Sequence, residues 1–350
     1  MAEGLSRKLG ADFRVGQVEV GLFNRVLLSD VSLKDPTGRE LLAARSLSCK
    51  IELLPLLRKE VSLRSVSLLD ADVRLYRARP GAPANFQFLI DAFSSGKTQK
   101  KSRLDLRVNS LIVRRCRVSY DVLSAPATPR EFNPSHVAVS ALDANVSLKR
   151  LTPDSLNLRV RKLAFREKCG LQVKRLTFRF AANRRKGTVE DFILELPDTY
   201  VAQERLTADY DARDAETFMQ SVVARGELRR SYVATDDIAG LVPALAGLHR
   251  KVRFSSDFEI TPGLIVLRNA EASTARGDFE LRSDVRLHRS EGRWVALEAA
   301  VVGLSVKSSL QEALWTAFSG KPLLPVLHKV GDIAFAGRLA YARNRRGLLD

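Results

Sequence analysis

The sequence is poor in the residue types that mark several functional classes. Its 350 residues include 4 histidines, 3 cysteines and 2 tryptophans. Cys49, Cys116 and Cys169 lie far apart and form no C-x-x-C pair, which excludes a zinc knuckle and a dithiol redox motif. We expect Cys49 and Cys116, at apolar positions of alternating runs, to act as small core hydrophobes. The number of cysteines does not show whether the protein lies in a reducing or an oxidising compartment, because a secreted protein can contain one disulfide and one free thiol.

Long apolar runs are also missing. No stretch approaches the roughly 18 apolar residues that a membrane-spanning helix needs, and Met1 to Gly10 lacks the apolar core of a signal peptide. The chain as written therefore carries no export element. If the protein works in a cell envelope, we expect that element to be missing from this sequence.

Signals for catalysis are sparse. Neither a P-loop nor a G-x-G-x-x-G after a strand occurs, and the histidines have the spacing of neither a zinc helix nor a nucleophile triad. They are His136, His249, His288 and His328. The neighbouring carboxylates Asp236/Asp237 and Asp209/Asp211 are candidates for an acid–base pair, but neighbours in sequence rarely converge on a substrate. We predict no enzyme, no cofactor and no metal site, although a triad of distant residues stays open.

The composition favours a folded, basic protein. Hydrophobic residues make up 45% and charged residues 28%, and the net charge is +17, so an electrostatic partner should be anionic. Basic residues concentrate only briefly, at 97–103, 184–186 and 343–346, and aromatic residues are not interleaved with them. This pattern disfavours a nucleic-acid partner and leaves phospholipid headgroups or lipopolysaccharide.

Most of the chain alternates apolar and polar residues with the period of a β-strand. Leu47, Cys49 and Ile51 alternate with polar neighbours, as do Leu142 and Ala144. Further alternating runs span 18–22, 71–75, 116–122, 156–160 and 192–196. The pattern predicts an all-β, mainly antiparallel fold.

A finer regularity lies inside the alternation: apolar residues recur at i, i+2, i+5 and i+7, so their side changes at the step of three. It occurs at Val26/Leu28/Val31/Leu33, Val61/Leu63/Val66/Leu68, Leu106/Val108/Leu111/Val113, Val137/Val139/Leu142/Ala144, Leu158/Val160/Leu163/Phe165 and Leu171/Val173/Leu176/Phe178. An extra residue forces a bulge or bend if one side is to stay apolar. The repetition predicts either a curled sheet or a sandwich whose strands turn corners, and the uneven spacing excludes a strict solenoid.

Helical signals are few. Phe86 to Phe93 follows a turn-like Pro-Gly-Ala-Pro sequence, Asp236 to Leu248 begins with aspartates suited to an N-cap, and Ser309 to Phe318 is amphipathic. We interpret these three as plugs over sheet ends rather than as binding helices.

Several segments resemble the AsmA-like and TamB proteins, the TamB branch more closely. Leu5 to Leu57 has a glycine-phenylalanine strand, a D-x-x-G turn and a following strand, as in the N-terminal segment of that family. Asn85 to Phe93, Ser110 to Ser124 and Arg166 to Phe180 are similar to the same region of TamB-like proteins of Bacteroidota, and Asp237 to Leu245 looks like a further family segment. The resemblance covers nearly the whole chain and is strongest over its first 196 residues.

The resemblance implies a periplasmic protein anchored in the inner membrane, with a curled β-structure whose apolar lumen shields acyl chains. Such proteins are implicated in moving phospholipid towards the outer membrane and in outer-membrane protein assembly. The family's N-terminal membrane helix and its C-terminal domain, which meets an outer-membrane barrel partner, are absent from this sequence. We therefore expect a fragment or a mis-started gene product.

Together these patterns predict an elongated curled sheet, a β-taco-like groove with a few short capping helices, in three segments: residues 1–95, 96–200 and 201–350. The predicted function is transport of phospholipid along this groove; a scaffold that pairs with outer-membrane strands is the alternative. Candidate groove-lining residues come from the parity-switched runs: Leu106, Val108, Leu158, Val160, Leu176 and Phe178.

Overall fold

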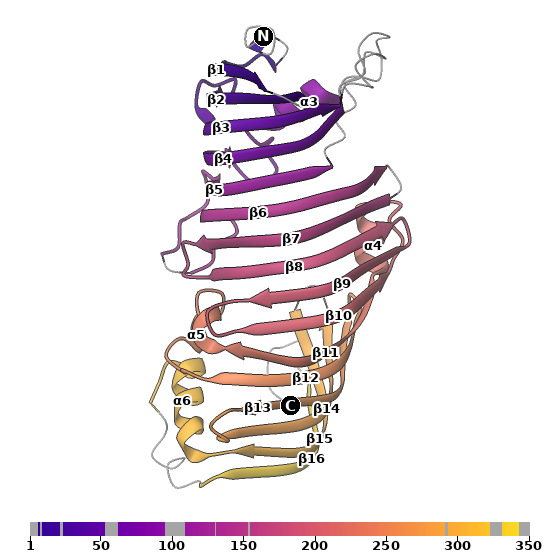
Figure 1. Ribbon diagram of the computed structural model, residues 1–350. Helices are drawn as coiled ribbons and strands as arrows, with labels where there is room; N and C mark the ends of the chain where they lie inside the picture. The colour runs from indigo at the N-terminus through magenta and orange to yellow at the C-terminus, as the bar shows by residue number, and fades with distance from the viewer. Residues whose placement is uncertain are drawn as a thin grey trace. The chain divides into compact units, whose positions relative to one another are not determined.

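The computed structural model describes residues 6–7, 9–21, 24–52, 62–94, 109–129, 131–152, 155–290, 293–322 and 331–342. They form one long, mainly antiparallel β-sheet with a few short helices, which confirms the predicted fold class. The sixteen described strands lie in the sheet in chain order (Figure 1). This order suits a chain in which nearly every strand returns beside its predecessor through a short turn.

The chain divides into two compact units. Unit 1 comprises residues 1–149 and 159–173, and unit 2 comprises residues 150–158 and 174–350. The predicted division into three segments stays a prediction.

Strands β1 to β5 belong to unit 1, which also holds most of β6 and β7 and the helix α3. Their bounds are β1 Phe13–Gly21, β2 Arg25–Lys34, β3 Glu40–Glu52, β4 Ser62–Arg77, α3 Gln87–Ser94, β5 Ser110–Val122, β6 His136–Thr152 and β7 Ser155–Glu167. Helix α3 confirms the predicted helix over 86–93. It lies in the connection between β4 and β5, which pair in parallel. The pairs β1–β2, β2–β3, β3–β4 and β5–β6 are antiparallel.

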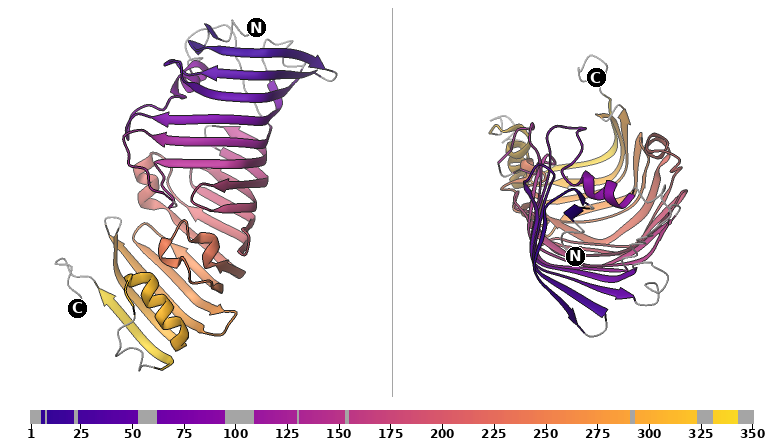
Figure 2. Two further views of the ribbon diagram at one scale, coloured as in Figure 1. Left: turned by 90° about the vertical axis from the view of Figure 1, so that its left-hand side faces the viewer. Right: turned by 90° about the horizontal axis from the view of Figure 1, so that it is seen from above.

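Unit 2 holds the later strands and the remaining described helices. Their bounds are β8 Gln172–Asn183, β9 Lys186–Glu195, β10 Tyr200–Asp209, α4 Ala215–Ser221, β11 Val223–Ala234, α5 Thr235–Ile238, η3 Pro243–Leu245, β12 Lys251–Ile260, β13 Leu264–Thr274, β14 Phe279–Ser290, β15 Arg293–Val306, α6 Ser308–Ser319 and β16 Ile333–Ala342. Viewed from above, its strands bend along their length (Figure 2, right).

One helix prediction was right and another was wrong in extent. Helix α6 confirms the prediction over 309–318. The predicted single helix over 236–248 is instead the short helix α5 and the 3-10 turn η3. Pro243 at the start of η3 has no backbone N–H and cannot continue a preceding helix. The short helix α4 was not predicted; its signal is Asp214, whose side chain caps the helix by accepting from the Thr217 N–H at 2.7 Å.

Helices α5 and α6 and the turn η3 lie at one end of the strands of unit 2, and α4 lies at the other end (Figure 1). α6 and η3 contact each other, and Leu248 and Leu310 are buried there. Figure 2 (left) shows α5 and α6 in front of the strands. This position agrees with the interpretation of these segments as plugs.

The strand turns are fixed by carboxylates and glycines. In the predicted D-x-x-G turn, Asp35 accepts hydrogen bonds from the N–H groups of Thr37 at 2.8 Å and Arg39 at 3.1 Å. Gly38 follows with φ of +85°, a left-handed conformation that glycine adopts without the steric cost of a Cβ. Glu167 accepts from the Cys169 N–H at 2.6 Å in the turn between β7 and β8. These turns keep consecutive strands adjacent.

The core of unit 1 is a line of small residues in mid-strand. Val31, Ala44, Ala71 and Cys116 form one buried cluster, and Cys116 is fully buried. The structure thus confirms Cys116 as a small core residue; Cys49 is half-buried, and all three cysteines are free thiols.

The predicted parity switches coincide with bends in two of the strands. Asp30, between Leu28 and Val31, and Ala141, between Val139 and Leu142, have left-handed φ values of 53° and 50°. A left-handed residue acts as one extra residue in the strand and shifts the alternation of side chains by one. The apolar residue that follows it therefore points to the same face as the apolar residues before it. The apolar face therefore continues across the bend.

Candidate functional site: the apolar sheet faces

Each unit presents one apolar face. In unit 1 the buried line is flanked on the same side by partly buried residues of every neighbouring strand. They are Phe13, Leu28, Leu42, Leu47, Leu68, Val113 and Leu142. Cross-strand pairs such as Leu28 with Leu47, and Leu47 with Leu68, place these side chains in rows, because directly paired residues share a face.

This face becomes more accessible towards one end of its strands. Val18 and Val20 of β1 are 49% and 78% exposed, and Leu111 of β5 is 38% exposed. Val20 pairs with Val26, which pairs with Cys49, so the outermost row is apolar too. The face therefore grades from a closed line of small residues to an open row of larger ones.

The apolar face of unit 2 crosses β12 to β16 in paired rows. One row is Phe258, Leu267, Val285, Ala299 and Leu339, and the next is Ile260, Ile265, Leu287, Leu297 and Tyr341. Ile260, Leu339 and Tyr341 are 39%, 43% and 40% exposed. Large apolar side chains that share a face and remain accessible mark an interaction surface more often than a lone exposed leucine does.

The same face continues over β8 to β11. Leu176 pairs with Leu194, and the rings of Phe178 and Phe192 lie 6.5 Å apart. Gly226 of β11 leaves room for its neighbours: a Cβ there would lie 2.8 Å from Cζ of Phe258. The same Cβ would lie closer still to Nε2 of Gln203, so the absence of a side chain lets both Gln203 and Phe258 approach the backbone of β11.

The structure locates four of the six predicted groove residues. Leu106 and Val108 lie outside the described residues. Leu176 and Phe178 lie on the apolar face of β8 in unit 2. Leu158 and Val160 share one face of β7 but fall in different units; Val160 is buried and Leu158 half-buried.

Sequence reasoning missed the rows on β12 to β16. The signal was present: Ile265, Leu267, Ala270 and Ala272 repeat the i, i+2, i+5, i+7 step, and Asn269 in the gap has a φ of 49°. What the sequence does not show is that Phe258 and Leu267 stand side by side, because that depends on the register between strands.

The opposite face of unit 2 carries ion pairs between neighbouring strands. Arg225 contacts Glu259 at 3.1 Å and Asp209 at 3.3 Å, and Arg229 contacts Asp257. Hydrogen bonds from Asn269 and Arg229 lower the pKa of Asp257 below its usual range. Since these pairs are exposed, they orient side chains and keep the face hydrated more than they stabilise the sheet.

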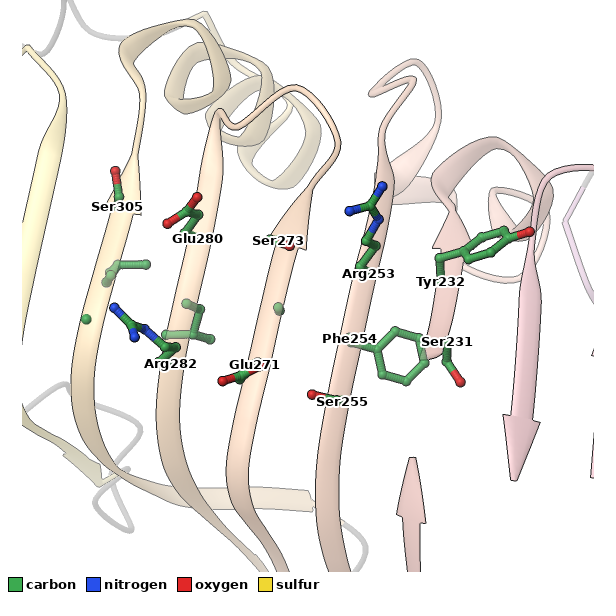
Figure 3. A pocket seen from close by; sticks show the side chains of 14 residues that line it. Ser231, Tyr232, Arg253, Phe254, Ser255, Glu271, Ser273, Glu280, Arg282 and Ser305 are labelled. Carbon is green, nitrogen blue, oxygen red and sulfur yellow. The ribbon is translucent and has the colours of Figure 1, made fainter. Parts of the chain in front are cut away.

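Two hollows are lined by residues of both faces of the sheet. One of about 640 Å³ is lined by side chains of β11 to β15 (Figure 3). Arg253, Ser273 and Glu280 are paired across three strands, so their side chains share one face. A larger hollow of about 1370 Å³ includes Arg225 and Arg229 among its lining residues. Their linings are mixed, because Phe254 and Leu281 also line the first hollow and Phe258 lines the larger one.

The sequence candidates for catalysis are held in separate structural contacts. Asp209 contacts Arg225, and Asp211 accepts from the Arg213 N–H at 3.2 Å. Asp236 contacts His249 at 3.0 Å, whereas its neighbour Asp237 accepts from the Asp198 N–H at 2.8 Å. In the part of the chain that the structure describes, no three His, Cys, Asp or Glu side chains gather closely enough to hold a metal ion.

None of the described helices has the length and apolarity required to cross a membrane. The site is thus defined by its sheet faces: apolar rows on one side and ion pairs on the other. Neither a protein-family model nor a curated protein matches this sequence.

Proposed function

We propose that this chain shields lipid acyl chains on the apolar faces of its sheet, as a TamB/AsmA-like module for phospholipid transport in the cell envelope. The observation that carries the proposal is the set of paired, accessible apolar rows, exemplified by Leu267, Val285 and Leu339. The described residues form a single sheet, so no second described sheet buries these rows.

The physical logic favours lipid as the partner of these rows. Removing apolar surface from water stabilises by about 0.8 kcal/mol per methylene. An acyl chain can lie along a row without hydrogen bonds, and the rows offer no charged side chain that would have to be desolvated. Many equivalent positions favour several weakly held chains over one tight site, which suits transport.

The first experiment measures lipid bound to the purified chain by gentle-detergent extraction and native mass spectrometry. More than one phospholipid per chain is expected. A chain that is lipid-free by this assay and also fails to bind a fluorescent fatty acid would contradict the proposal.

A pair of variants tests which face holds lipid. Leu339→Asp with Tyr341→Asp places charge on the apolar rows of β16 at exposed positions, whereas Ala340→Asp places it between them on the polar face. We expect the first variant to lose at least half of the bound acyl chains and the second to retain them, with unchanged circular dichroism in both. Equal retention would show that lipid sits elsewhere.

A strand-pairing scaffold is the second candidate, favoured by β1. This strand stands first in the sheet order, and all of its residues from Gly16 to Gly21 are exposed. An accessible first strand can add a strand from a partner. This function predicts that lipid-free protein binds an extended amphipathic peptide and that bound lipid does not compete.

A further inference from the structure

A second surface of unit 1 combines exposed cations with exposed apolar side chains. It consists of four connections, residues 35–39, 77–84, 121–136 except 130, and 167–171, and is called the strand-end surface here. Backbone bonds hold them in place: the Leu123 N–H donates to Arg77 O at 3.0 Å, and the Lys168 N–H donates to Ala138 O of β6 at 3.0 Å.

Three acidic groups of the strand-end surface are engaged in hydrogen bonds, and two of them are buried. Asp35 is buried and accepts from the Tyr76 hydroxyl at 2.5 Å. Glu167 is buried and accepts from the Ala138 N–H at 3.0 Å. Asp121 lies 2.8 Å from Nδ1 of His136. Asp35 and Glu167 keep their negative charge, but both side chains lie below the exposed layer and are out of contact with a partner at the surface.

The cations, in contrast, are exposed. Arg39, Arg79 and Lys168 face solvent, and the Arg39 guanidinium lies over the Tyr76 ring at 5.1 Å. Among the described residues of this surface, Glu131 is the fully exposed acid. The exposed charge of the surface is therefore positive.

Two large apolar side chains project beside these cations. Leu123 is 52% exposed and Phe132 is 43% exposed, both in the connection between β5 and β6. That connection is braced: Asn133 donates to Pro126 O at 3.0 Å, and Nε2 of His136 lies 2.9 Å from Ala125 O. Apolar side chains fixed in water by such bonds are preorganised for a partner, since little further ordering is required on binding.

We propose that the strand-end surface docks onto an anionic lipid bilayer. Its exposed cations complement anionic headgroups, and Leu123 and Phe132 enter the boundary between headgroups and acyl chains. The combination fits a bilayer better than a nucleic acid, because one aromatic ring beside a leucine provides no stacking platform. The inference stands independently of lipid binding on the sheet faces.

Co-sedimentation of the full chain with vesicles tests the docking. Vesicles of phosphatidylcholine with one third phosphatidylglycerol should bind, and pure phosphatidylcholine vesicles should bind at least fivefold less. Leu123→Ser with Phe132→Ser should reduce binding to the anionic vesicles at least fivefold. Met219→Ser, which removes a 64% exposed apolar side chain from α4 in unit 2, is the matched control and should leave binding unchanged.

A depth measurement keeps the inference testable if binding has several contributions. Phe132→Trp fluorescence, after subtraction of the parent signal, should be quenched by brominated lipid in anionic vesicles, and Met219→Trp should not. Equal binding by the double serine variant, or no quenching at position 132, would overturn the docking surface. Lipid extraction from the double serine variant separates the two proposals, because acyl chains on the sheet faces should be retained.

Discussion

The two units bend their strands by different chemistry. In unit 1 the bend is lined by the small apolar residues Val31, Ala44 and Ala71, with Cys116 completing the line. In unit 2 buried serines stand in mid-strand instead: Ser231, Ser256 and Ser283.

The serine hydroxyls lie within hydrogen-bond distance of carbonyl groups beside breaks in the strand register. The Ser283 hydroxyl lies 3.1 Å from both Asp284 O and Ala300 O, and Ser256 lies 3.0 Å from Asp257 O and 3.1 Å from Arg268 O. The strand pairing shifts next to both residues. A hydroxyl thus satisfies carbonyls that the interrupted ladder leaves with poorer partners.

One device is common to both units. The Arg115 N–H in unit 1 donates to Asp143 at 3.0 Å, and the Asn269 N–H in unit 2 donates to Asp284 at 2.7 Å. Both donors are left-handed residues, with φ of 53° and 49°. The comparison shows that a bend needs a hydrogen-bond partner for each displaced backbone group. The buried side chains beside the bend can be either apolar or polar.

The largest expected effect comes from overfilling the closed line of unit 1. Ala71→Leu should destabilise unit 1 by about 1–3 kcal/mol, because Ala71 is 3% exposed and its neighbours are equally enclosed. Hydrogen exchange of peptides from β3 to β5 measures the change locally. Ala272→Leu, on the more open face of unit 2, is the control and should be tolerated; equal loss in both would remove the difference between the units.

A smaller effect is expected from removing a serine of unit 2. Ser283→Ala should cost about 1 kcal/mol, because the Asp284 and Ala300 carbonyls lose a donor. Exchange of β14 and β15 amides reports the change, and Ser290→Ala, at the exposed end of β14, supplies the baseline. If the two variants behave alike, the buried hydroxyl has no structural role.

Replacing an apolar residue at the bend of unit 1 by a serine, as found in unit 2, should lower the free energy of unfolding still less. The Cys116 thiol lies 3.3 Å from Arg114 O and 3.8 Å from Leu68 O, so Cys116→Ser finds acceptors already in place. We expect a change of about 1 kcal/mol or less, measured by exchange of β5 amides. A loss well above this value would mean that the serine chemistry works only in unit 2.

The smallest effect concerns pH and the strand-end loops. The hydrogen bond with Asp121, and then that with Ala125 O, raises the pKa of His136 above its usual value. Both ring nitrogens contact acceptors, so both donate only in the protonated ring. The folded-state pKa is the higher one, so this stabilisation is complete below the ordinary histidine pKa and is lost as pH rises through the raised value.

Amide exchange of residues 123–129 and 131–135 should therefore accelerate beyond the intrinsic pH effect as pH rises through the raised pKa of His136, and His136→Gln should remove this extra dependence. The buried Arg250–Asp278 pair, at 2.8 Å, provides the comparison in unit 2. The Arg250 guanidinium stays charged over the pH range in which His136 loses its proton. Amide exchange in the turn at residues 274–278 should therefore show no extra pH dependence.

Much of the fold was predictable because its signals are local. Alternation at Leu142 and Ala144 predicted a strand, and the step from Val139 to Leu142 predicted the bend that Ala141 makes. Of the candidate site, Leu176 and Phe178 lie on the apolar face. The extent of the helix over 236–248 was wrong because its apolar spacing was weighed above Pro243.

By itself, the sequence determined which side of each strand is apolar, because side chains of successive residues point to opposite faces whatever the strand pairs with. Only the tertiary structure decided that β4 pairs in parallel with β5, that Phe258 covers Gly226, and that Ser283 is buried under two carbonyls. These features depend on register between distant segments. Register is set by the combined pairing of whole strands, so no short stretch of sequence encodes it.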